Sequence, residues 1–313
     1  MNYSVFVSCP RQMEYLLETE LTGLGLEVSR VSPQGVFGQA SLTVLYQMII
    51  GSRLANRVQL ILFEADVTSA DSLLQACRDF AWHEVFSLAR TFAVEFHGSA
   101  PFINNTMYGG QLIKDGVVDC FNAHYDERPS VDKKQPDVLI HGYLKRQRLT
   151  VSLDLVGYSL HQRGYRLEAG GAPLKENVAA AVLYRANWPA LLQQGHALVD
   201  PFCGSATLLI EAALMATNTA PGLARDDQAV RHWLQHDETV WQDTLAAARQ
   251  AVTSTTCEIS GSDADARGIG IAKQNIARAG MAEVITVSLS RLLILLLRHR
   301  AAYWSLTHLT VSD

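Results

Sequence analysis

The pattern of apolar and polar positions divides the chain into short strands and helices. In the first 64 residues, alternating runs predict strands at 3–8, 27–31, 35–40 and 57–63, and apolar residues at helical spacing predict helices at about 10–24 and 42–50. The resulting order, β-α-β-β-α-β, is that of a ferredoxin-like unit. We therefore expect residues 1–64 to form one α+β unit.

The next region, 65–156, has a different order of elements. Its pattern predicts helices at 69–80 and 106–123, a strand at 91–96, and a hairpin of strands 137–143 and 149–155 around a basic turn at 145–148. A polar loop at 129–136 carries Lys133 and Lys134, and the second helix carries Lys114. Such cations can contact phosphates, which position a nucleic acid without reading its sequence.

A third region follows a linker and lead-in helix at 157–189. The short apolar run 197–199 ends in Asp200, a turn of small residues follows, and a helix with an apolar face begins near Thr207. Strand, turn and helix in this order open a doubly wound sheet, which binds ligands at the carboxyl ends of its strands.

A second strand of this sheet is predicted at 258–263, and it also ends in an acid, Asp263. In nucleotide-binding sheets an acid at this point accepts the ribose hydroxyls. A helix at 264–279 and the start of a third strand at 283–287 follow. Gly268 and Gly270 lie inside this helix, so they are no dinucleotide fingerprint. The predicted region, 190–287, is the first part of a Rossmann-like domain.

Composition narrows the possible partners and location. The formal net charge is -5, so any RNA contact must come from local basic patches. The five cysteines are scattered without metal-ligand spacing, and His232 and His236 lack a third ligand, so we expect no metal site. The first residues form no signal peptide, and no stretch suits a membrane span. We expect a cytoplasmic protein.

The run DPFCGSAT at 200–207 resembles the D-P-x-C-G-S-G-T motif of methyltransferases that use S-adenosylmethionine to modify guanine in RNA. Ala206 stands where the motif has its second glycine. HQRGYR at 161–166 and APLKEN at 172–177 resemble the segment leading into that domain, and region 65–156 resembles a THUMP domain. The resemblance implies S-adenosylmethionine as cofactor, held by Asp200, Pro201, Cys203, Gly204, Ser205, Thr207 and Asp263.

The same resemblance, to the bacterial 23S ribosomal RNA guanine-N2 methyltransferases, implies methyl transfer to the exocyclic amine of one guanine, with 23S rRNA as partner. The expected RNA contacts are Lys114, Lys133, Lys134, Arg163 and Arg166. Two alternatives stay open: Lys114 forms surface ion pairs, and the two arginines make structural hydrogen bonds in the linker.

The end of the chain departs from this family. Its members carry an Asn-Pro-Pro-Tyr motif, which holds the target amine, after the fourth strand, and this sequence has none. Permitted codons for residues 304–313, read from the third letter, give V-T-N-P-P-Y-G-E-R. We therefore expect a frameshift between about 287 and 304, an out-of-frame tail at 288–313, and a truncated chain without catalytic residues.

The predicted fold is α/β, with an α+β N-terminal half made of the ferredoxin-like unit and the THUMP-like domain, followed by an incomplete Rossmann-like methyltransferase domain. Three other functions are possible. DNA amino-methyltransferases have the same kind of sheet and also carry the Asn-Pro-Pro-Tyr motif. A nicotinamide oxidoreductase shares the fold, but the glycine fingerprint is absent here. The chain can also be a non-catalytic RNA-binding fragment.

Overall fold

The computed structural model describes residues 2–166, 174–225 and 229–290. It divides into two compact units, and the predicted mixed α/β class is confirmed. Unit 1 consists of residues 1–163 and 219–252, and unit 2 consists of 164–218 and the chain after 252. Within the described residues, no helix combines the length and apolar character that a membrane span requires.

The ferredoxin-like part of unit 1 has the predicted order of elements. Ser41 caps the second helix, because its side chain accepts a hydrogen bond from the backbone N–H of Val44. Buried Leu17, Leu21 and Leu45 come from the helical apolar faces. The elements are β1 (Tyr3–Ser8), α1 (Glu14–Gly23), β2 (Glu27–Ser32), β3 (Gly35–Ala40), α2 (Leu42–Gly51) and β4 (Arg57–Asp66).

The second part of unit 1 begins with a capped helix. Ser69 and Ser72 exchange side-chain-to-backbone hydrogen bonds in a capping box, and the Asn105 side chain accepts from the Tyr108 N–H at 2.7 Å. The elements are α3 (Ala70–Arg78), η1 (Trp82–Glu84), β5 (Phe92–Ser99), α4 (Thr106–Tyr125), β6 (Val138–Lys145) and β7 (Arg148–Asp154).

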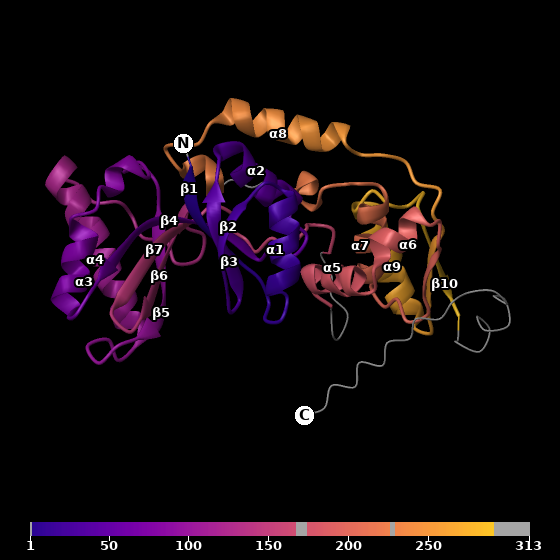
Figure 1. Cartoon of the computed structure of the whole chain (residues 1–313), viewed down its shortest axis with the longest axis horizontal. Coiled ribbons are helices and arrows are strands. Elements are labelled where there is room, and N and C mark those ends of the chain that lie inside the picture. The colour runs from indigo at the N-terminus through magenta and orange to yellow at the C-terminus, as the bar shows by residue number, and fades with distance from the viewer. Residues whose placement is uncertain (1, 167–173, 226–228, 291–313) are drawn as a thin grey trace. The chain divides into compact units, whose positions relative to one another are not determined.

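These two parts share one sheet, which the sequence did not predict. Its seven strands run in the order β2-β3-β1-β4-β7-β6-β5 (Figure 1). β4 joins the halves, because it pairs antiparallel with β1 on one side and with β7 on the other. β4 also runs to Asp66, three residues past its predicted end. The paired register reaches from Gln59↔Asp154 to Asp66↔Arg148.

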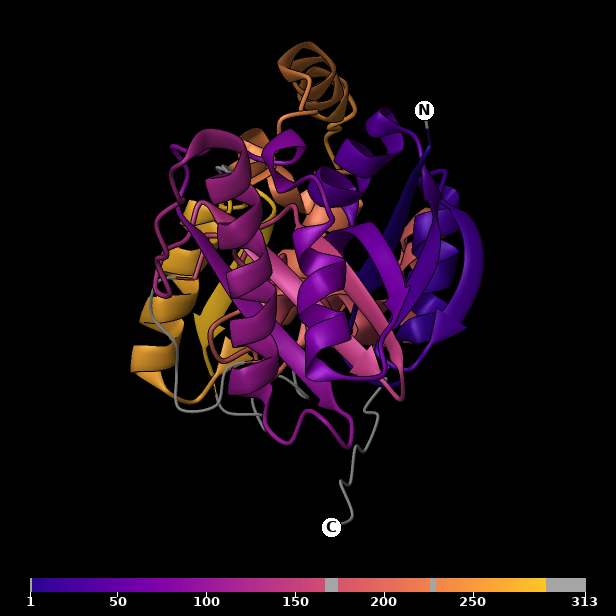
Figure 2. The ribbon, with the colours of Figure 1, turned by 90° about the vertical axis from the view of Figure 1, so that its left-hand side faces the viewer.

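Among the described residues, helices α3 and α4 cover one face of the β5–β7 part of this sheet. α3 and α4 lie side by side over the strands (Figure 2). Gly142 of β6 belongs to that face, because a Cβ there would lie 2.2 Å from Ile113 Cδ1 of α4. Side chains alternate along a strand, so His141 and Tyr143 lie on the opposite face of the sheet, away from α3 and α4.

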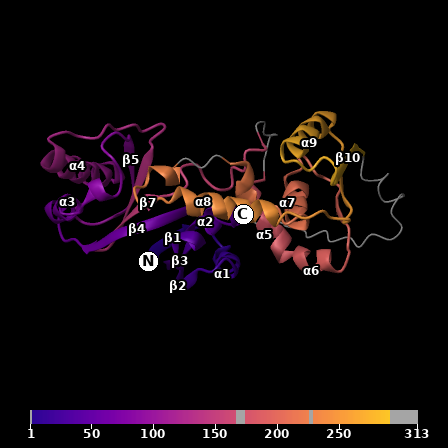
Figure 3. The ribbon, with the colours of Figure 1, turned by 90° about the horizontal axis from the view of Figure 1, so that it is seen from above.

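Residues 219–252 belong to unit 1, although the sequence analysis placed them inside the methyltransferase region 190–287. They contain η2 (Pro221–Ala224), η3 (Ala229–His232) and α8 (Glu238–Gln250), and α8 packs along α2 (Figure 3). Tyr46 of α2 holds the segment 219–252 against unit 1. Its hydroxyl accepts from the Asp237 N–H at 2.9 Å, and its ring lies 5.1 Å from that of Trp241.

Unit 2 is built around three parallel strands in the order β10-β9-β8, which is one half of a Rossmann-like sheet. Its elements are α5 (Glu176–Arg185), α6 (Trp188–Gln193), β8 (Leu198–Asp200), α7 (Thr207–Ala216), β9 (Ile259–Asp263), α9 (Ala266–Arg278) and β10 (Ile285–Leu289). Ser288 and Leu289, which the sequence analysis assigned to the tail, pair with β9. Residues 291–313, the remainder of that predicted tail beyond Ser290, lie outside the described residues.

A buried carboxylate ties β4 to β7 at one end of their pairing. Asp154 is 1% exposed and forms an ion pair with Arg57 of β4, and it accepts a hydrogen bond from His141 Nε2 at 3.1 Å. Burial raises the pKa of Asp154, but the hydrogen bond from His141 and the charge of Arg57 lower it by more. The pKa of Asp154 therefore lies below its usual range. The ionised form therefore contributes to the stability of unit 1.

We expect Asp154→Asn to destabilise unit 1 by on the order of 3 kcal/mol, because it breaks a buried charge pair. Since the folded pKa is lowered, this contribution is complete above about pH 4 and is lost as the pH falls through the folded value. Thermal unfolding followed by circular dichroism measures both effects. Asp66→Asn, which removes an exposed partner of Arg148, is the control and should change stability by less than about 1 kcal/mol. Equal stability of the two variants would contradict the assignment.

Candidate functional site

The predicted cofactor site lies at the carboxyl edge of the unit 2 sheet. Asp200 ends β8 and Asp263 ends β9, and because the strands are parallel both carboxylates reach the same edge. Asp263 Oδ2 accepts a hydrogen bond from the Gly204 N–H at 3.0 Å, and its Oδ1 accepts from the Asp265 N–H at 2.9 Å. Asp263 therefore contacts the loop that follows β8.

That loop takes two left-handed turns. Gly204 has φ +48°, and no atom lies within 4 Å of the position a Cβ would take, so space is open beside its backbone. Ala206 has φ +66°, a conformation that favours glycine. Ala206 is 0% exposed, so its methyl group is packed inside the unit and does not line the open space.

The loop is held from the second strand and the last helix. The Cys203 N–H donates to the Ser262 carbonyl at 2.9 Å, and the buried Asn275 of α9 donates from Nδ2 to the Ser205 carbonyl at 3.1 Å. The loop is thus fixed by the Asp263 side chain and the Ser262 carbonyl of β9, and also by Asn275 of α9. A loop with this much support is preorganised for a ligand.

Gly261 of β9 permits the close approach of strand and loop. A Cβ at this position would lie 2.5 Å from Leu209 Cδ1, 2.9 Å from Cys203 Cβ and 3.1 Å from the Asp200 carbonyl oxygen. Such contacts require the neighbours to shift. The absence of a side chain at Gly261 therefore lets β9 bring Asp263 to the loop after β8.

The two strand-end carboxylates also repel each other. Burial raises the pKa of Asp200, and the negative charge of Asp263 raises it as well. The ionised Asp200 is thus held at a cost to the folded state, as is common where a protein retains a charge for binding. Burial likewise raises the pKa of the Cys203 thiol to about 12, so this cysteine is no nucleophile at neutral pH.

The remaining predicted cofactor residues surround the same loop. Pro201 is half-buried, and its carbonyl lies 3.5 Å from the Ser262 hydroxyl. The hydroxyls of Ser205 and Thr207 lie 3.3 Å apart at the start of α7. The structure therefore brings all seven predicted residues onto one loop and the end of the adjacent strand. What they bind remains a prediction.

Lys114, Lys133 and Lys134, three of the predicted RNA contacts, do not form one cluster with the arginines of the linker. Lys114 pairs with Asp115 at 2.6 Å on α4, which is the alternative kept open in the sequence analysis. Lys133 and Lys134 are exposed on the loop between α4 and β6, where they remain candidates for phosphate contact.

The two arginines of the linker have structural partners. Arg163 is 2% exposed, and its guanidinium donates at 2.5 Å to the carbonyls of Leu160 and Arg53. Arg166 donates to the Leu174 carbonyl and pairs with the buried Glu176 at 3.2 Å. A phosphate cannot reach Arg163 without opening unit 1, so its prediction as an RNA contact is wrong, and the structural alternative holds.

Unit 1 has a basic hollow that the sequence analysis did not assign. It has a volume of about 650 Å³, and because Tyr143 lines it, it lies on the sheet face opposite α3 and α4, which we call the polar face. Arg30 stacks over the Phe37 ring at 4.2 Å, and Tyr143 is half exposed. The charged lining residues are Arg30, Lys145, Arg146, Arg148 and Glu64. The sequence predicts only a basic hairpin turn at 145–148, because Arg30 comes from a distant strand.

Three family models match the chain in succession. Residues 4–59 match the RlmL ferredoxin-like domain, residues 67–154 match the THUMP domain, and residues 163–299 match the RMKL-like methyltransferase domain. The last match includes the loop with Asp200 and the strand with Asp263. The chain therefore carries the sequence features of all three domains that its pattern predicts.

Curated relatives cover nearly the whole chain. The ribosomal RNA large subunit methyltransferase K/L of Legionella pneumophila (strain Philadelphia 1) is 54% identical over 285 residues, and that of Pseudomonas aeruginosa PAO1 is 45% identical over 289 residues. Each alignment covers 91% of this chain and 40% of the relative. The chain thus spans 40% of the length of these K/L proteins.

Solved structures share the fold of both units. The crystal structure of SMU.472 complexed with SAH has a TM-score of 0.82 and 26% identity, covering 93% of this chain and 76% of that one. A predicted N6-adenine-specific DNA methylase from Listeria monocytogenes has a TM-score of 0.83 and 26% identity, covering 93% and 75%.

We expect Gly261→Ala to destabilise unit 2 by about 1–3 kcal/mol, because the added methyl overpacks the contact between β9 and the loop. Gly270→Ala is the matched control. Gly270 lies exposed in α9 with no atom within 4 Å of a Cβ, so the change should stabilise by up to about 1 kcal/mol. Opposite signs in thermal unfolding support the close packing, whereas two stabilised variants would refute it.

Proposed function

The chain carries, in this order, an RlmL ferredoxin-like domain, a THUMP domain and an RMKL-like methyltransferase domain, and from this set we propose that it supplies the RNA-binding and cofactor-binding parts of a 23S ribosomal RNA guanine-N2 methyltransferase. The K/L relatives are named for the large ribosomal subunit RNA, which motivates this substrate. Such an enzyme acts where ribosomes are assembled, in the cytoplasm.

The observation that carries the proposal is the pair of carboxylates at neighbouring strand ends. S-adenosylmethionine contains a ribose and a cationic sulfonium and amino group, and carboxylates accept hydrogen bonds from hydroxyls and ammonium groups. Asp263 uses one lone pair of each oxygen on a backbone N–H, so a second lone pair of each is available for the ribose hydroxyls. The open space beside Gly204 allows the ligand to approach the loop backbone.

We assign RNA binding to unit 1, where the hollow presents four basic side chains and one acidic one. The net charge of the whole chain is -5, so RNA binding must rely on a local excess of cations such as this one. Tyr143, which is half exposed, adds a ring on which an unpaired base can stack. Lys133 and Lys134 are proposed as further phosphate contacts.

Methyl transfer itself requires a group that holds the target amine. The methyl donor is already activated, so positioning of the amine supplies most of the rate enhancement. No Asn-Pro-Pro-Tyr run occurs in the 313 residues. We therefore propose that this chain binds cofactor and RNA and does not by itself transfer a methyl group.

A DNA substrate is the second candidate, because one similar structure is described as an N6-adenine-specific DNA methylase. The THUMP match and the ribosomal RNA names of the relatives favour RNA over DNA. Competition between 23S rRNA and duplex DNA for the full chain separates the two, since an RNA-binding protein should prefer rRNA at equal ionic strength.

We expect Asp263→Asn to weaken binding of S-adenosylmethionine or its demethylated product at least about tenfold, because a charged hydrogen-bond acceptor contributes roughly 1.5–3 kcal/mol. Asp200→Asn should weaken binding similarly while raising the melting temperature, since it removes a partly buried charge whose pKa is raised. Isothermal titration calorimetry and thermal unfolding measure these quantities. Parent-like affinity in both variants would show that neither carboxylate binds the cofactor.

We expect the double variant Lys145→Ala and Arg146→Ala to bind 23S rRNA more weakly than the parent. Each lost phosphate contact should also reduce the slope of log affinity against log salt by about 0.7–0.9. Arg78→Ala is the control, because Arg78 pairs with Asp119 between α3 and α4, on the helix-covered side. An unchanged salt slope in the double variant would exclude the hollow as the RNA contact.

A further inference from the structure

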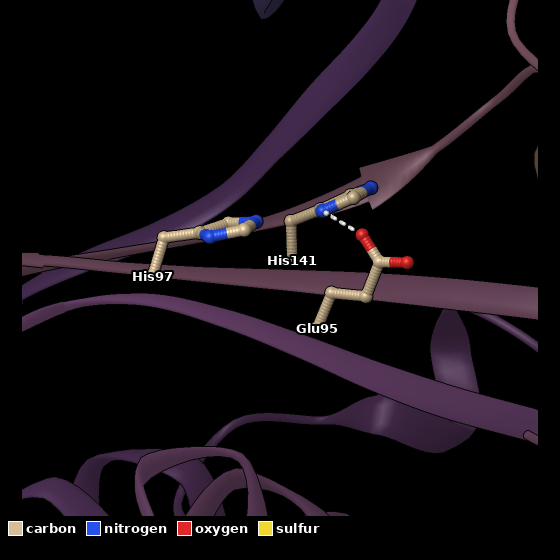
Figure 4. A group of neighbouring side chains, drawn as sticks. All are labelled: Glu95, His97 and His141. Carbon is tan, nitrogen blue, oxygen red and sulfur yellow. Dashed lines mark ion pairs between the residues drawn. The ribbon is translucent and has the colours of Figure 1, made fainter. Parts of the chain in front are cut away.

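We propose that unit 1 binds a transition-metal ion, with zinc as the best fit, through Glu95, His97 and His141 on the polar face of the seven-stranded sheet (Figure 4). The three residues offer one carboxylate oxygen and two imidazole nitrogens, and these atoms all lie within 4.8 Å of one another. The sequence pattern predicts no metal site, because neither the cysteine spacing nor the His232 and His236 pair provides a ligand set.

Strand pairing creates this group. Glu95 and His97 are two residues apart on β5, so their side chains lie on the same face. β6 runs parallel to β5 in a register that pairs Glu95 with His141. Buried Phe96, between the two β5 residues, packs against α4 on the other face, which fixes the direction of its neighbours.

Asp154 prepares His141 as a ligand. An ionised carboxylate only accepts hydrogen bonds, so the 3.1 Å contact means that His141 Nε2 carries a hydrogen and donates it. The other ring nitrogen, Nδ1, faces Glu95 Oε2 at 3.5 Å, and a metal ion bound between these two atoms would take the place of the proton that their ion pair requires. A carboxylate behind a metal-ligating histidine is a common arrangement that orients the ring and raises its basicity. Here the ion pair with Arg57 keeps Asp154 in place.

The spacing suits one ion. Ligand atoms about 2.1 Å from a tetrahedral zinc ion lie about 3.4 Å apart. His141 Nδ1 and Glu95 Oε2 are 3.5 Å apart, so one ion can contact both without movement of the strands. His97 is exposed, and rotation of its side chain brings its nitrogen to the third position. Two histidines and one carboxylate are a ligand set that zinc takes, with the fourth position left to water.

The ligand types favour zinc over calcium or magnesium. Imidazole is a ligand of zinc and related transition metals, whereas calcium and magnesium prefer sets of oxygen atoms. His141 is only 7% exposed, so its ring is held by its surroundings. Because β5 is the edge strand of the sheet, the ion would fasten this strand to β6.

The test uses the full chain without a histidine tag and freed of metal by a chelator. We expect one equivalent of Zn²⁺ to bind in calorimetry, one equivalent of Co²⁺ to give the intense visible absorption of a tetrahedral ion, and Zn²⁺ to raise the melting temperature. His97→Gln and Glu95→Gln alter exposed side chains, so they should preserve the fold and each lower Zn²⁺ affinity at least about tenfold.

Asp154→Asn tests the orienting role, and we expect it to lower Zn²⁺ affinity by about 10–100-fold in protein that circular dichroism shows to be folded. His196→Gln, an exposed histidine of unit 2, is the control and should bind like the parent. Parent-like affinity of both His97→Gln and Glu95→Gln, or less than one Zn²⁺ per chain, would overturn the proposal. An equal loss in His196→Gln would do so as well, by locating the ion elsewhere.

Discussion

Antiparallel pairing between β4 and β7 is the constraint on which unit 1 depends. β4 belongs to the ferredoxin-like part and β7 to the THUMP part, and their backbone hydrogen bonds merge two predicted domains into one seven-stranded sheet. The buried Asp154 at the end of this pairing bonds to both neighbouring strands, through Arg57 of β4 and His141 of β6. Both the basic hollow and the proposed metal site lie on the face that this pairing extends.

The sequence was sufficient to predict the elements and their order, because hydrophobic periodicity is a local signal. It could not predict the pairing of β4 with β7, since strand partners about ninety residues apart leave no local pattern. The segment 219–252 was missed for the same reason: its apolar residues show that it packs, and only the structure shows that Tyr46 receives it. Arg163 was misjudged because its carbonyl partners are backbone atoms, which sequence does not reveal.

The arrangement of the loop proposed to bind cofactor could be predicted more fully than that of the surface proposed to bind RNA. A motif of eight consecutive residues places Asp200 and Thr207 close together whatever the rest of the fold does, and Asp263 follows from the order of strands. Ala206 shows what the motif alone could not decide. Its left-handed φ explains why glycine is the usual residue there, since an alanine in this conformation is strained. Its complete burial means that the methyl group does not enter the open space beside Gly204.

The polar face of the sheet carries charged side chains, and these determine how it can be hydrated and what it can bind. No described helix packs on the face opposite α3 and α4, so that face must be hydrated or covered by a partner, and its polar side chains lower the cost of hydration. Yet Glu64 and Asp66 both pair with Arg148 at 3.1–3.2 Å, so part of the positive charge in the hollow is already neutralised. Arg30, Lys145 and Arg146 therefore carry the attraction for phosphate, and a divalent ion at Glu95 would add to it on the same face. Metal and RNA would then bind with positive coupling, because each lowers the electrostatic cost of the other's charge.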